Sequence, residues 1–388
     1  MQARVVIVGG GVMGAAAACF LARDHGLRAT VLERDPAYRR ASSALSASSI
    51  RQQFTQPINI ALSRWSLDFL RRVGDELEVD GERPALGLVE PGYLYLATPA
   101  GAATLRANPA VQRAHGAAVA LLDADATRQR FPWLAVDDLA AAALGLAGEG
   151  WFDGPALLQA LRRKAIACGA RFVAAEAVAF DTAGARVRAV RCRDGSVHAA
   201  DAVLLTAGAW TAPLAALLGC ALPVAPKKRD VFVFDSPAAL PGCPLVVDPS
   251  GLWFRPEGRG FLCGAPPRDG DPDEPPLDAI DHAQFDEQLW PALARRVPGF
   301  EALRLRSAWA GYYEMNAFDH NGLAGALPGW DNVHTACGFS GHGMQQAPAV
   351  GSALAAVVAG GASSAPPLDA LSPHRLLEGR PLREDNVI

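Results

Sequence analysis

The chain has 388 residues, of which 50% are hydrophobic and 20% are charged, a composition typical of an ordered globular protein. This length exceeds what one hydrophobic core usually supports, so we expect two closely joined domains. The 36 basic and 40 acidic residues give a net charge of −4, which offers no general attraction for nucleic acid and excludes it as an expected partner.

Cysteine spacing and hydropathy restrict the environment further. The 7 cysteines show no C-x-x-C and no Cys/His pairing at metal spacing, so we expect no metal site and a reducing compartment. No apolar run approaches the ~18 residues of a membrane span. The first predicted strand begins near residue 4, which leaves no room for a targeting sequence. We therefore expect no transmembrane segment and a cytoplasmic location.

The N-terminal residues predict a buried strand, a G-x-G-x-x-G turn, an Ala-rich helix and a second strand that ends in an acid. Gly9 permits the tight turn, Gly11 lets a pyrophosphate approach the backbone, and Gly14 lets the helix pack against the sheet. The helix N-terminus offers free N–H groups to phosphates. Glu33 follows Gly14 at the distance where an acid accepts hydrogen bonds from an adenosine ribose. A Gly-rich turn without a ligand is the alternative.

The following elements indicate the first part of a second domain. The Ser-rich segment 40–51 predicts an extended loop of hydroxyl groups, and apolar residues recur at helical spacing over 57–73. Residues 87–97 predict a β segment, and the Ala-rich stretch 101–148 predicts helices and loops.

The chain is then expected to return to the nucleotide domain. We predict a helix over 156–167, a strand over 171–180, a hairpin over 186–198, and a strand at 202–206 that belongs to the nucleotide sheet. Short strands alternate with Pro-rich loops over residues 224–305, which fits a second visit to the other domain. A strand near 332–338 and an apolar helix over 344–359 complete the pattern.

A second Gly-rich turn lies between that last strand and helix, over residues 338–348. Gly341 and Gly343 let the backbone pass close to a ligand ring, and N–H groups at a helix start stabilise negative charge that develops there. With the N-terminal turn, the Ser-rich segment ending in Arg51 and the segment 206–210, this motif resembles the glycine/D-amino-acid oxidase (DAO) superfamily of FAD-dependent oxidoreductases. That superfamily includes sarcosine oxidase, dimethylglycine dehydrogenase and glycine oxidase.

Four segments are most similar to the branch called FAD-dependent oxidoreductase domain-containing proteins: 51–54, 226–229, 308–313 and 338–348. The resemblance implies an α/β fold, with a doubly wound Rossmann-like FAD-binding domain and an interleaved α+β substrate domain on an antiparallel sheet. The FAD-binding domain is expected over 1–86, 151–223 and 306–388, and the substrate domain over 87–150 and 224–305.

The resemblance also implies site residues. FAD is expected to contact Gly9, Gly11, Val12, Met13, Gly14, Glu33, Arg34, Ser42, Ser43, Val178, Ala207, Gly208, Trp210, Gly338, Gly341, His342, Gly343, Met344 and Gln345. Arg51 is expected to bind a substrate carboxylate, which its planar fork of donors suits. Tyr313 is expected to donate to that carboxylate or line the cavity, and His342 to orient the flavin or titrate with its reduction. Structural hydrogen bonding by Arg51 or His342 and core packing by Tyr313 are the alternatives.

Departures from the family pattern limit these expectations. A second cation that holds the carboxylate in sarcosine oxidase falls on Gln345, whose neutral amide adds no charge. The cysteine that binds flavin covalently falls on Gly311, so FAD is expected to be noncovalent. The lysine that promotes reaction with oxygen falls on Leu262, which favours a dehydrogenase over an oxidase. The cluster 227–229 is expected to be a solvated basic turn rather than part of the pocket mouth.

The prediction is an FAD-dependent oxidoreductase acting on a small amine or amino acid of the N-methyl or D-amino acid class, by hydride transfer to flavin N5. Arg51, Tyr313, His342 and Gln345 are its expected catalytic residues. The electron acceptor is left open among oxygen, a quinone and an electron-transfer protein. The alternatives are a 2-hydroxy acid substrate, and a flavin-containing assembly or binding protein with little turnover. Binding of NAD at the first turn alone is disfavoured, because the last helix would then have no ring to meet.

Overall fold

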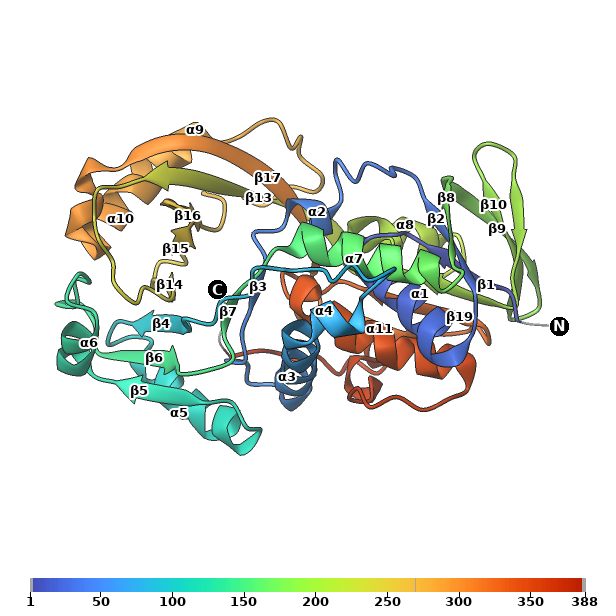
Figure 1. The fold of residues 1–388 in the computed structure, drawn as a ribbon, viewed down its shortest axis with the longest axis horizontal. Helices are drawn as coiled ribbons and strands as arrows, with labels where there is room; N and C mark the ends of the chain where they lie inside the picture. The colour runs from blue at the N-terminus through green and yellow to red at the C-terminus, as the bar shows by residue number, and fades with distance from the viewer. Residues whose placement is uncertain (1–2, 269, 386–388) are drawn as a thin grey trace.

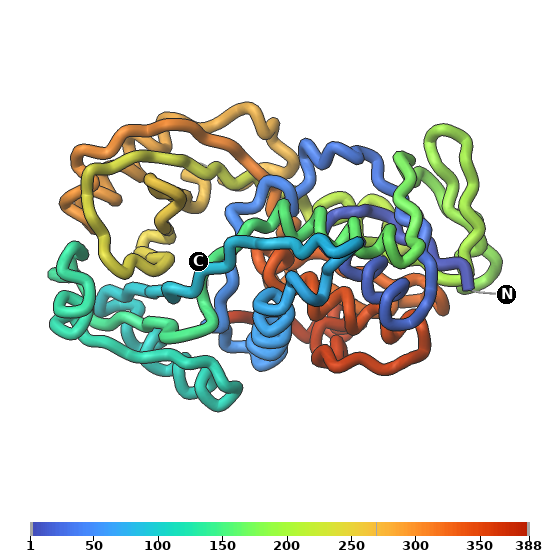
Figure 2. The backbone as a smooth tube through the Cα atoms, viewed as in Figure 1, coloured from blue at the N-terminus to red at the C-terminus, as the bar shows by residue number. Residues whose placement is uncertain are grey.

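Two large sheets lie at opposite ends of the molecule's long axis (Figure 1). The computed structural model describes residues 3–268 and 270–385. Figure 2 shows the chain passing between the two ends more than once, so that segments from the start, middle and end of the sequence lie together in the right-hand half of the view. Each half is therefore built from separate stretches of the sequence.

The first sheet is parallel apart from one edge strand. Its strands are short, apolar and mostly buried, as expected for a parallel sheet covered on both faces. The predicted strand at 202–206 pairs parallel with the first strand, Val5 opposite Ala202, and thus belongs to this sheet. The order is β18 (Leu323–Ala326), β19 (Val333–Cys337), β12 (Ala202–Leu205), β1 (Val5–Val8), β2 (Ala29–Glu33) and β8 (Arg171–Ala174), with β18 antiparallel.

Helices cover one face of this sheet and a small sheet covers the other. Val5 and Ile7 of β1 pack into the core with the helices, whereas Val6 and Val8 face the other layer. The helical layer holds α1 (Val12–His25), α3 (Pro57–Arg71), α7 (Gly154–Ala167) and α11 (Gly343–Ala359). The opposite layer holds β9 (Ala177–Ala183), β10 (Arg186–Cys192), β11 (Val197–Ala199) and α8 (Thr211–Ala216).

Small residues bring the first and last long helices close together. A Cβ atom on Gly351 of α11 would lie only 2.5 Å from the Cβ of Ala16 in α1. The two helices therefore approach at a distance that a larger side chain would prevent. Because each helix follows one of the two Gly-rich turns, this packing also brings the two turns to the same region of the molecule.

The second sheet is antiparallel except where β14 pairs with β4. Its strands alternate: Leu94, Val246 and Phe254 face a separate aromatic core, and the residues between them face either the cavity or a smaller core that Phe54 and Ile60 join. The order is β17 (Arg304–Asn316), β13 (Val224–Asp235), β16 (Gly260–Gly264), β15 (Trp253–Glu257), β14 (Leu245–Val247), β4 (Tyr93–Ala97), β6 (Ala141–Gly145) and β5 (Val119–Leu122).

Shorter elements complete the described chain. These are α2 (Ser42–Leu45), β3 (Ser49–Ile50), α4 (Val73–Glu76), α5 (Ala102–Ala114), α6 (Ala124–Arg130), β7 (Gly150–Trp151), η1 (Gly208–Trp210), α9 (His282–Gln284), η2 (Phe285–Leu289), α10 (Trp290–Arg296), η3 (Pro298–Ala302), η4 (Asp369–Leu371) and α12 (His374–Leu377). All 7 cysteines are free. In the described residues, no helix has the length and apolarity needed to cross a membrane, and His, Cys, Asp and Glu side chains form no group of three suited to a metal ion.

Several predicted elements need correction. The Ser-rich segment is not a fully extended loop, because it contains the helical turn α2 and then β3, which pairs with β7. The predicted strand 171–180 is interrupted between β8 and β9, where the chain leaves the parallel sheet. Only the last five residues of the predicted segment 87–97 form a strand, β4. The domain limits stay a prediction, and β17 crosses the expected boundary at 305/306 because it pairs with β13 along its whole length.

Candidate active site

A cavity of about 1140 Å³ lies between the two sheets. It is lined by the first Gly-rich turn at Gly9, Gly11 and Val12, and by the last one at Gly341–Met344. The two turns also meet directly, because a Cβ on Gly343 would be 3.7 Å from the Met13 Cε. Residues more than 300 positions apart in the sequence thus form one site. The volume exceeds that of most drug-sized ligand pockets, which favours an extended ligand.

The first turn leaves backbone donors open toward this cavity. Gly9 has φ of +99°, a conformation that favours glycine, and a Cβ on Gly14 would lie 2.0 Å from the Gly9 carbonyl oxygen. The N-cap of α1 is Gly11, whose lack of a side chain leaves the first N–H groups uncapped apart from a 3.3 Å bond from Val12 N to Ser43 Oγ. A helix start of this kind attracts phosphate.

Glu33 is tied to the backbone around the same turn. Its Oε2 accepts from Gly10 N and its Oε1 accepts from Asp35 N, each at 2.8 Å. Each carboxylate oxygen keeps a second lone pair for a ribose hydroxyl. The predicted cofactor residues that line this part of the cavity are Glu33, Arg34, Ser42, Ser43, Val178, Ala207, Gly208 and Trp210, with Arg34 stacked 4.1 Å from the centre of the Trp210 ring.

The last turn presents a second open helix start. Gly338 and Gly341 have φ of +72° and +97°, and Ser340 between them also has a positive φ. The first residues of α11 have no side-chain cap, since the N-cap His342 makes no bond to them. The backbone N–H groups of this long helix therefore remain available to a ligand that carries negative charge.

Arg51, His342 and Gln345 form one connected group. The Arg51 backbone N–H donates to Gln345 Oε1 at 2.7 Å, and Arg51 Nη2 lies 3.0 Å from His342 Nε2. A guanidinium only donates, so Nε2 accepts and the ring proton of His342 lies on Nδ1. Burial and the neighbouring Arg51 lower the pKa of His342 well below its usual value, which keeps the imidazole neutral. Its buried Nδ1 has no partner among the described residues.

Arg51 is held in place by its neighbours in the segment 51–54 and by Glu149, which the sequence did not single out. Its guanidinium lies 4.1 Å from the centre of the Phe54 ring, and Nη1 donates to the Gln53 carbonyl at 3.2 Å. The buried carboxylate of Glu149 accepts from the backbone N–H groups of Gln52 and Gln53 and from the Gln53 side chain. Burial raises the pKa of Glu149 although these amides oppose the shift. Glu149 therefore fixes the loop that carries Arg51.

Glu314 is a second acid that sequence reasoning missed, a partly exposed residue whose carboxylate oxygen Oε2 is shielded from solvent. It lines the cavity from β17, where its Oε1 accepts from Phe339 N at 3.4 Å and its Oε2 has no partner among the described residues. Burial raises its pKa to about 7, although backbone N–H groups of the last turn oppose the shift. The sequence gave no signal for Glu314, because its carboxylate is shielded from solvent only when the strand β17 packs against the last Gly-rich turn.

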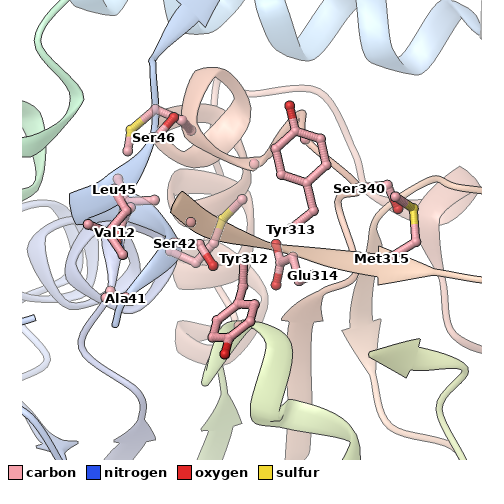
Figure 3. Close-up of a pocket in the computed structure, with 18 of the residues that line it drawn as sticks. Val12, Ala41, Ser42, Leu45, Ser46, Tyr312, Tyr313, Glu314, Met315 and Ser340 are labelled. Atoms are coloured by element: carbon pink, nitrogen blue, oxygen red, sulfur yellow. The ribbon is translucent and has the colours of Figure 1, made fainter. Parts of the chain in front are cut away.

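Tyr313 stands at the cavity edge with 39% of its surface exposed. In Figure 3, Tyr313 and Tyr312 project to opposite sides of β17, as consecutive strand residues do. The prediction of a solvated basic turn at 227–229 is wrong. These residues belong to β13, and Arg229 forms two 2.9 Å bonds with Asp271, its guanidinium 5.4 Å from the Tyr313 ring centre. Pairing with β17 continues along residues 227–229, so these charged residues extend β13 and do not form a turn.

The end of the described chain also reaches the cavity. Arg383 and Glu384 line it, and Glu384 accepts from Thr55 Oγ1 at 2.8 Å and from Asn59 Nδ2 at 2.6 Å. The carboxylate thus lies at the start of α3, where a negative charge is stabilised by the helix dipole. No motif marked these residues.

Some predicted residues lie beside the cavity rather than on its wall. Gly14 packs on the turn, Gly338 forms the bend before α11, and Gln345 supports Arg51. Gly311 lines the cavity, and a Cβ there would be 3.0 Å from the Leu45 Cβ. Leu262 is buried and is not one of the lining residues.

These features fit FAD. Two uncapped long helices begin at one cavity, glycines keep side chains away from both turns, and Glu33 stands at the end of β2. The first turn would hold the pyrophosphate, Glu33 the ribose, and the α11 start with the His342 Nδ1–H the ring. With FAD bound, the site would hold a two-electron acceptor.

Comparison with known proteins agrees with this geometry. Residues 4–357 match the family described as DAO, FAD dependent oxidoreductase. The chain is 40% identical to FAD-dependent oxidoreductase domain-containing protein 1 of Xenopus laevis over 426 aligned positions, covering 100% of this chain and 85% of that protein. A crystal structure of glycine oxidase from Geobacillus kaustophilus superposes with a TM-score of 0.81 at 26% identity, covering 96% of this chain and 98% of that one. L-proline dehydrogenase from P. horikoshii shares the fold, with a TM-score of 0.85 at 23% identity over 98% and 99% of the two chains.

Proposed function

Because the chain belongs to the DAO family of FAD-dependent oxidoreductases, we propose that it oxidises a small amine or amino acid, with noncovalent FAD as electron acceptor. The carrying observation is the Arg51 side chain, a buried cation in the same cavity as the two open helix starts. Bound FAD would supply the acceptor for the two electrons and the hydride that leave the α-carbon of the substrate, while the amine lone pair would form the C=N bond and water would hydrolyse the imine.

The chain's own residues bind and orient the substrate. Arg51 offers N–H groups to a carboxylate while His342 and Gln53 fix its position. His342 stays neutral beside Arg51 and keeps its Nδ1–H as a donor. Tyr313 offers a phenol from the cavity edge. No strong base is needed when the amine enters unprotonated, since positioning alone then favours transfer.

Other features support the remaining parts of the proposal. Gly311 offers no sulfur to flavin, which supports noncovalent binding. The seven free cysteines support a reducing compartment such as the cytoplasm. The two domains would divide the work, the first binding FAD and the second covering the substrate.

Anaerobic reduction of the bound flavin tests the proposal. Purified holoprotein is mixed with N-methyl amino acids, D-amino acids and 2-hydroxy acids, and flavin absorbance is followed. Bleaching by an amine or amino acid is expected. Bleaching by 2-hydroxy acids alone would contradict an amine substrate and favour a 2-hydroxy acid dehydrogenase. No bleaching by any compound would favour a flavin-containing assembly or binding protein. Acid precipitation should release FAD into the supernatant, whereas colour in the pellet would contradict noncovalent binding.

A further inference from the structure

A second buried arginine lines the cavity from the sheet opposite the flavin turns. Arg255 lies in β15 with 4% of its surface exposed, and its neighbour Phe254 faces the aromatic core on the other side of the strand. Alternation along the strand therefore turns the Arg255 side chain toward the cavity. The motifs in the sequence did not mark it.

The Arg255 guanidinium has N–H groups that make no hydrogen bond within the described residues. It contacts the Pro256 carbonyl at 3.0 Å, the Glu257 carboxylate, and the Ala47 carbonyl at 2.7 Å, which uses three of its five N–H groups. Its Nε is buried and has no partner among the described residues. Glu257 is half exposed, so water weakens this pair, and burial lowers the pKa of Arg255. The guanidinium also lies 5.0 Å from the centre of the Trp151 ring, so its charge has neighbours, but its Nε–H has no acceptor in the described part of the chain.

The register of the second sheet places Arg255 at a defined distance from the residues around Arg51. β4, β14 and β15 align Tyr93, Leu245 and Arg255 in one row, as continued from the pairs Leu245–Tyr93 and Val246–Phe254. All three line the cavity, and two strand spacings separate the Tyr93 and Arg255 backbones by about 10 Å. Tyr95, on the same face as Tyr93, has its ring centre 5.9 Å from the Arg51 guanidinium.

The cavity is therefore lined by two arginines, and the row that runs from Arg255 through Leu245 to Tyr93 leads toward Arg51. A substrate with a single carboxylate would occupy Arg51 and leave the free donors of Arg255 without an acceptor. Building on the proposed function, we propose that the substrate is an amino dicarboxylate, whose α-carboxylate binds Arg51 and whose second carboxylate binds Arg255. Arg255 is then the residue that determines specificity.

The competing explanation is structural, since Arg255 also holds the Ser-rich segment through the Ala47 carbonyl. The two explanations differ in what the second carboxylate contributes. Loss of a purely structural contact lowers the reaction of every substrate alike, whereas loss of a subsite affects only the substrate that reaches it.

Paired substrates separate these explanations. Anaerobic flavin reduction is measured with N-methylglycine, N-methylaspartate and N-methylglutamate, on the wild-type holoprotein and on Arg255→Gln and Arg255→Lys. We expect a kcat/KM about 10- to 100-fold higher for a dicarboxylate than for N-methylglycine. Arg255→Gln should remove that advantage and change N-methylglycine by less than about threefold, and Arg255→Lys should restore part of it. Arg259→Gln is the matched control, because Arg259 is exposed in the turn after β15.

Equal loss for all three substrates in Arg255→Gln, or no dicarboxylate advantage in the wild type, would overturn the inference and leave the proposed function standing. Binding provides a readout that needs no turnover: glutarate and butyrate are titrated while the flavin spectrum is recorded. Glutarate should bind about 10-fold more tightly than butyrate in the wild type and equally in Arg255→Gln. Equal binding in the wild type would overturn the inference even if no amine reduced the flavin.

Discussion

The two walls of the cavity are built by different means. On the side of the parallel sheet, backbone N–H groups at two helix starts face the cavity, and glycines keep side chains away. On the side of the second sheet, side chains face the cavity, with Arg255 contributed by β15 and both Tyr313 and Glu314 by β17. A backbone wall suits a cofactor that every family member shares, and a side-chain wall suits a substrate that differs among them.

Gly14→Ala should have the largest effect if the first wall depends on backbone approach. The new Cβ would lie 2.0 Å from the Gly9 carbonyl oxygen, so the helix start must move. We expect a loss of about 3 kcal/mol in the free energy of unfolding and at least a tenfold weaker FAD affinity. Urea unfolding and the bound flavin content measure both.

Gly360→Ala is the control for that substitution. Its Cβ would meet no atom within 4 Å, and only its positive φ opposes the change, so a cost of about 1 kcal/mol with normal FAD content is expected. Equal FAD content in Gly14→Ala and Gly360→Ala would show that the first wall tolerates a side chain.

Glu314→Gln tests the charge hidden in the second wall. The folded-state pKa of about 7 lies above the ordinary value of 4.5, so the folded protein keeps a proton that the unfolded chain releases. The contribution of Glu314 to stability is therefore present below pH 4.5 and is lost as pH rises to 7, by about 3 kcal/mol. In urea unfolding between pH 4 and 8, the free energy of unfolding of Glu314→Gln should rise relative to that of the wild type as the pH increases from 4.5 to 7.

The exposed Glu301 provides the comparison, because Glu301→Gln should leave the pH profile of the wild type unchanged. A constant difference between Glu314→Gln and the wild type at all pH values would contradict a raised pKa.

Arg51→Gln should separate substrate binding from cofactor binding. The substitution keeps a polar side chain but removes the charge, and a charge-assisted hydrogen bond contributes about 2 to 3 kcal/mol. We expect about a 100-fold lower kcat/KM for carboxylate-bearing amines in anaerobic flavin reduction, with FAD content unchanged. Arg64→Gln, at an exposed position of α3, is the control. Retained kcat/KM in Arg51→Gln would remove Arg51 from the substrate site.

Glu384→Ala should give the smallest effect, since it removes a carboxylate that ties the end of the described chain to the residues around the start of α3. The bonds to Thr55 and Asn59 are lost, and partly exposed hydrogen bonds of this kind contribute about 1 kcal/mol. Thermal unfolding followed by circular dichroism measures this change. Glu378→Ala, which affects an exposed pair with Arg380, should have no measurable effect, and an equal shift in both variants would argue against stabilisation by Glu384.

The sequence predicted the fold of the first wall well, because its signals are local. Gly9, Gly11 and Gly14 report a turn and a helix start by their spacing, and Gly341 and Gly343 do so again near the end. The family resemblance, confirmed by the comparison over residues 4–357, also gave the right fold class. The sequence pattern predicted the wrong local structure at 171–180 and at 227–229. At both places, pairing with a neighbouring strand determines whether the chain bends or continues as a strand.

By itself, therefore, the sequence determined the backbone features of this protein: two Gly-rich turns, each followed by a long helix, and an acid at the end of the second strand. The tertiary structure decided which side chains share the cavity. Arg255, Glu314 and Glu149 became visible only there, because burial and strand register depend on residues far apart in the chain. The spacing of glycines along the chain predicts a turn, but it does not predict which charged side chains become buried in the same cavity.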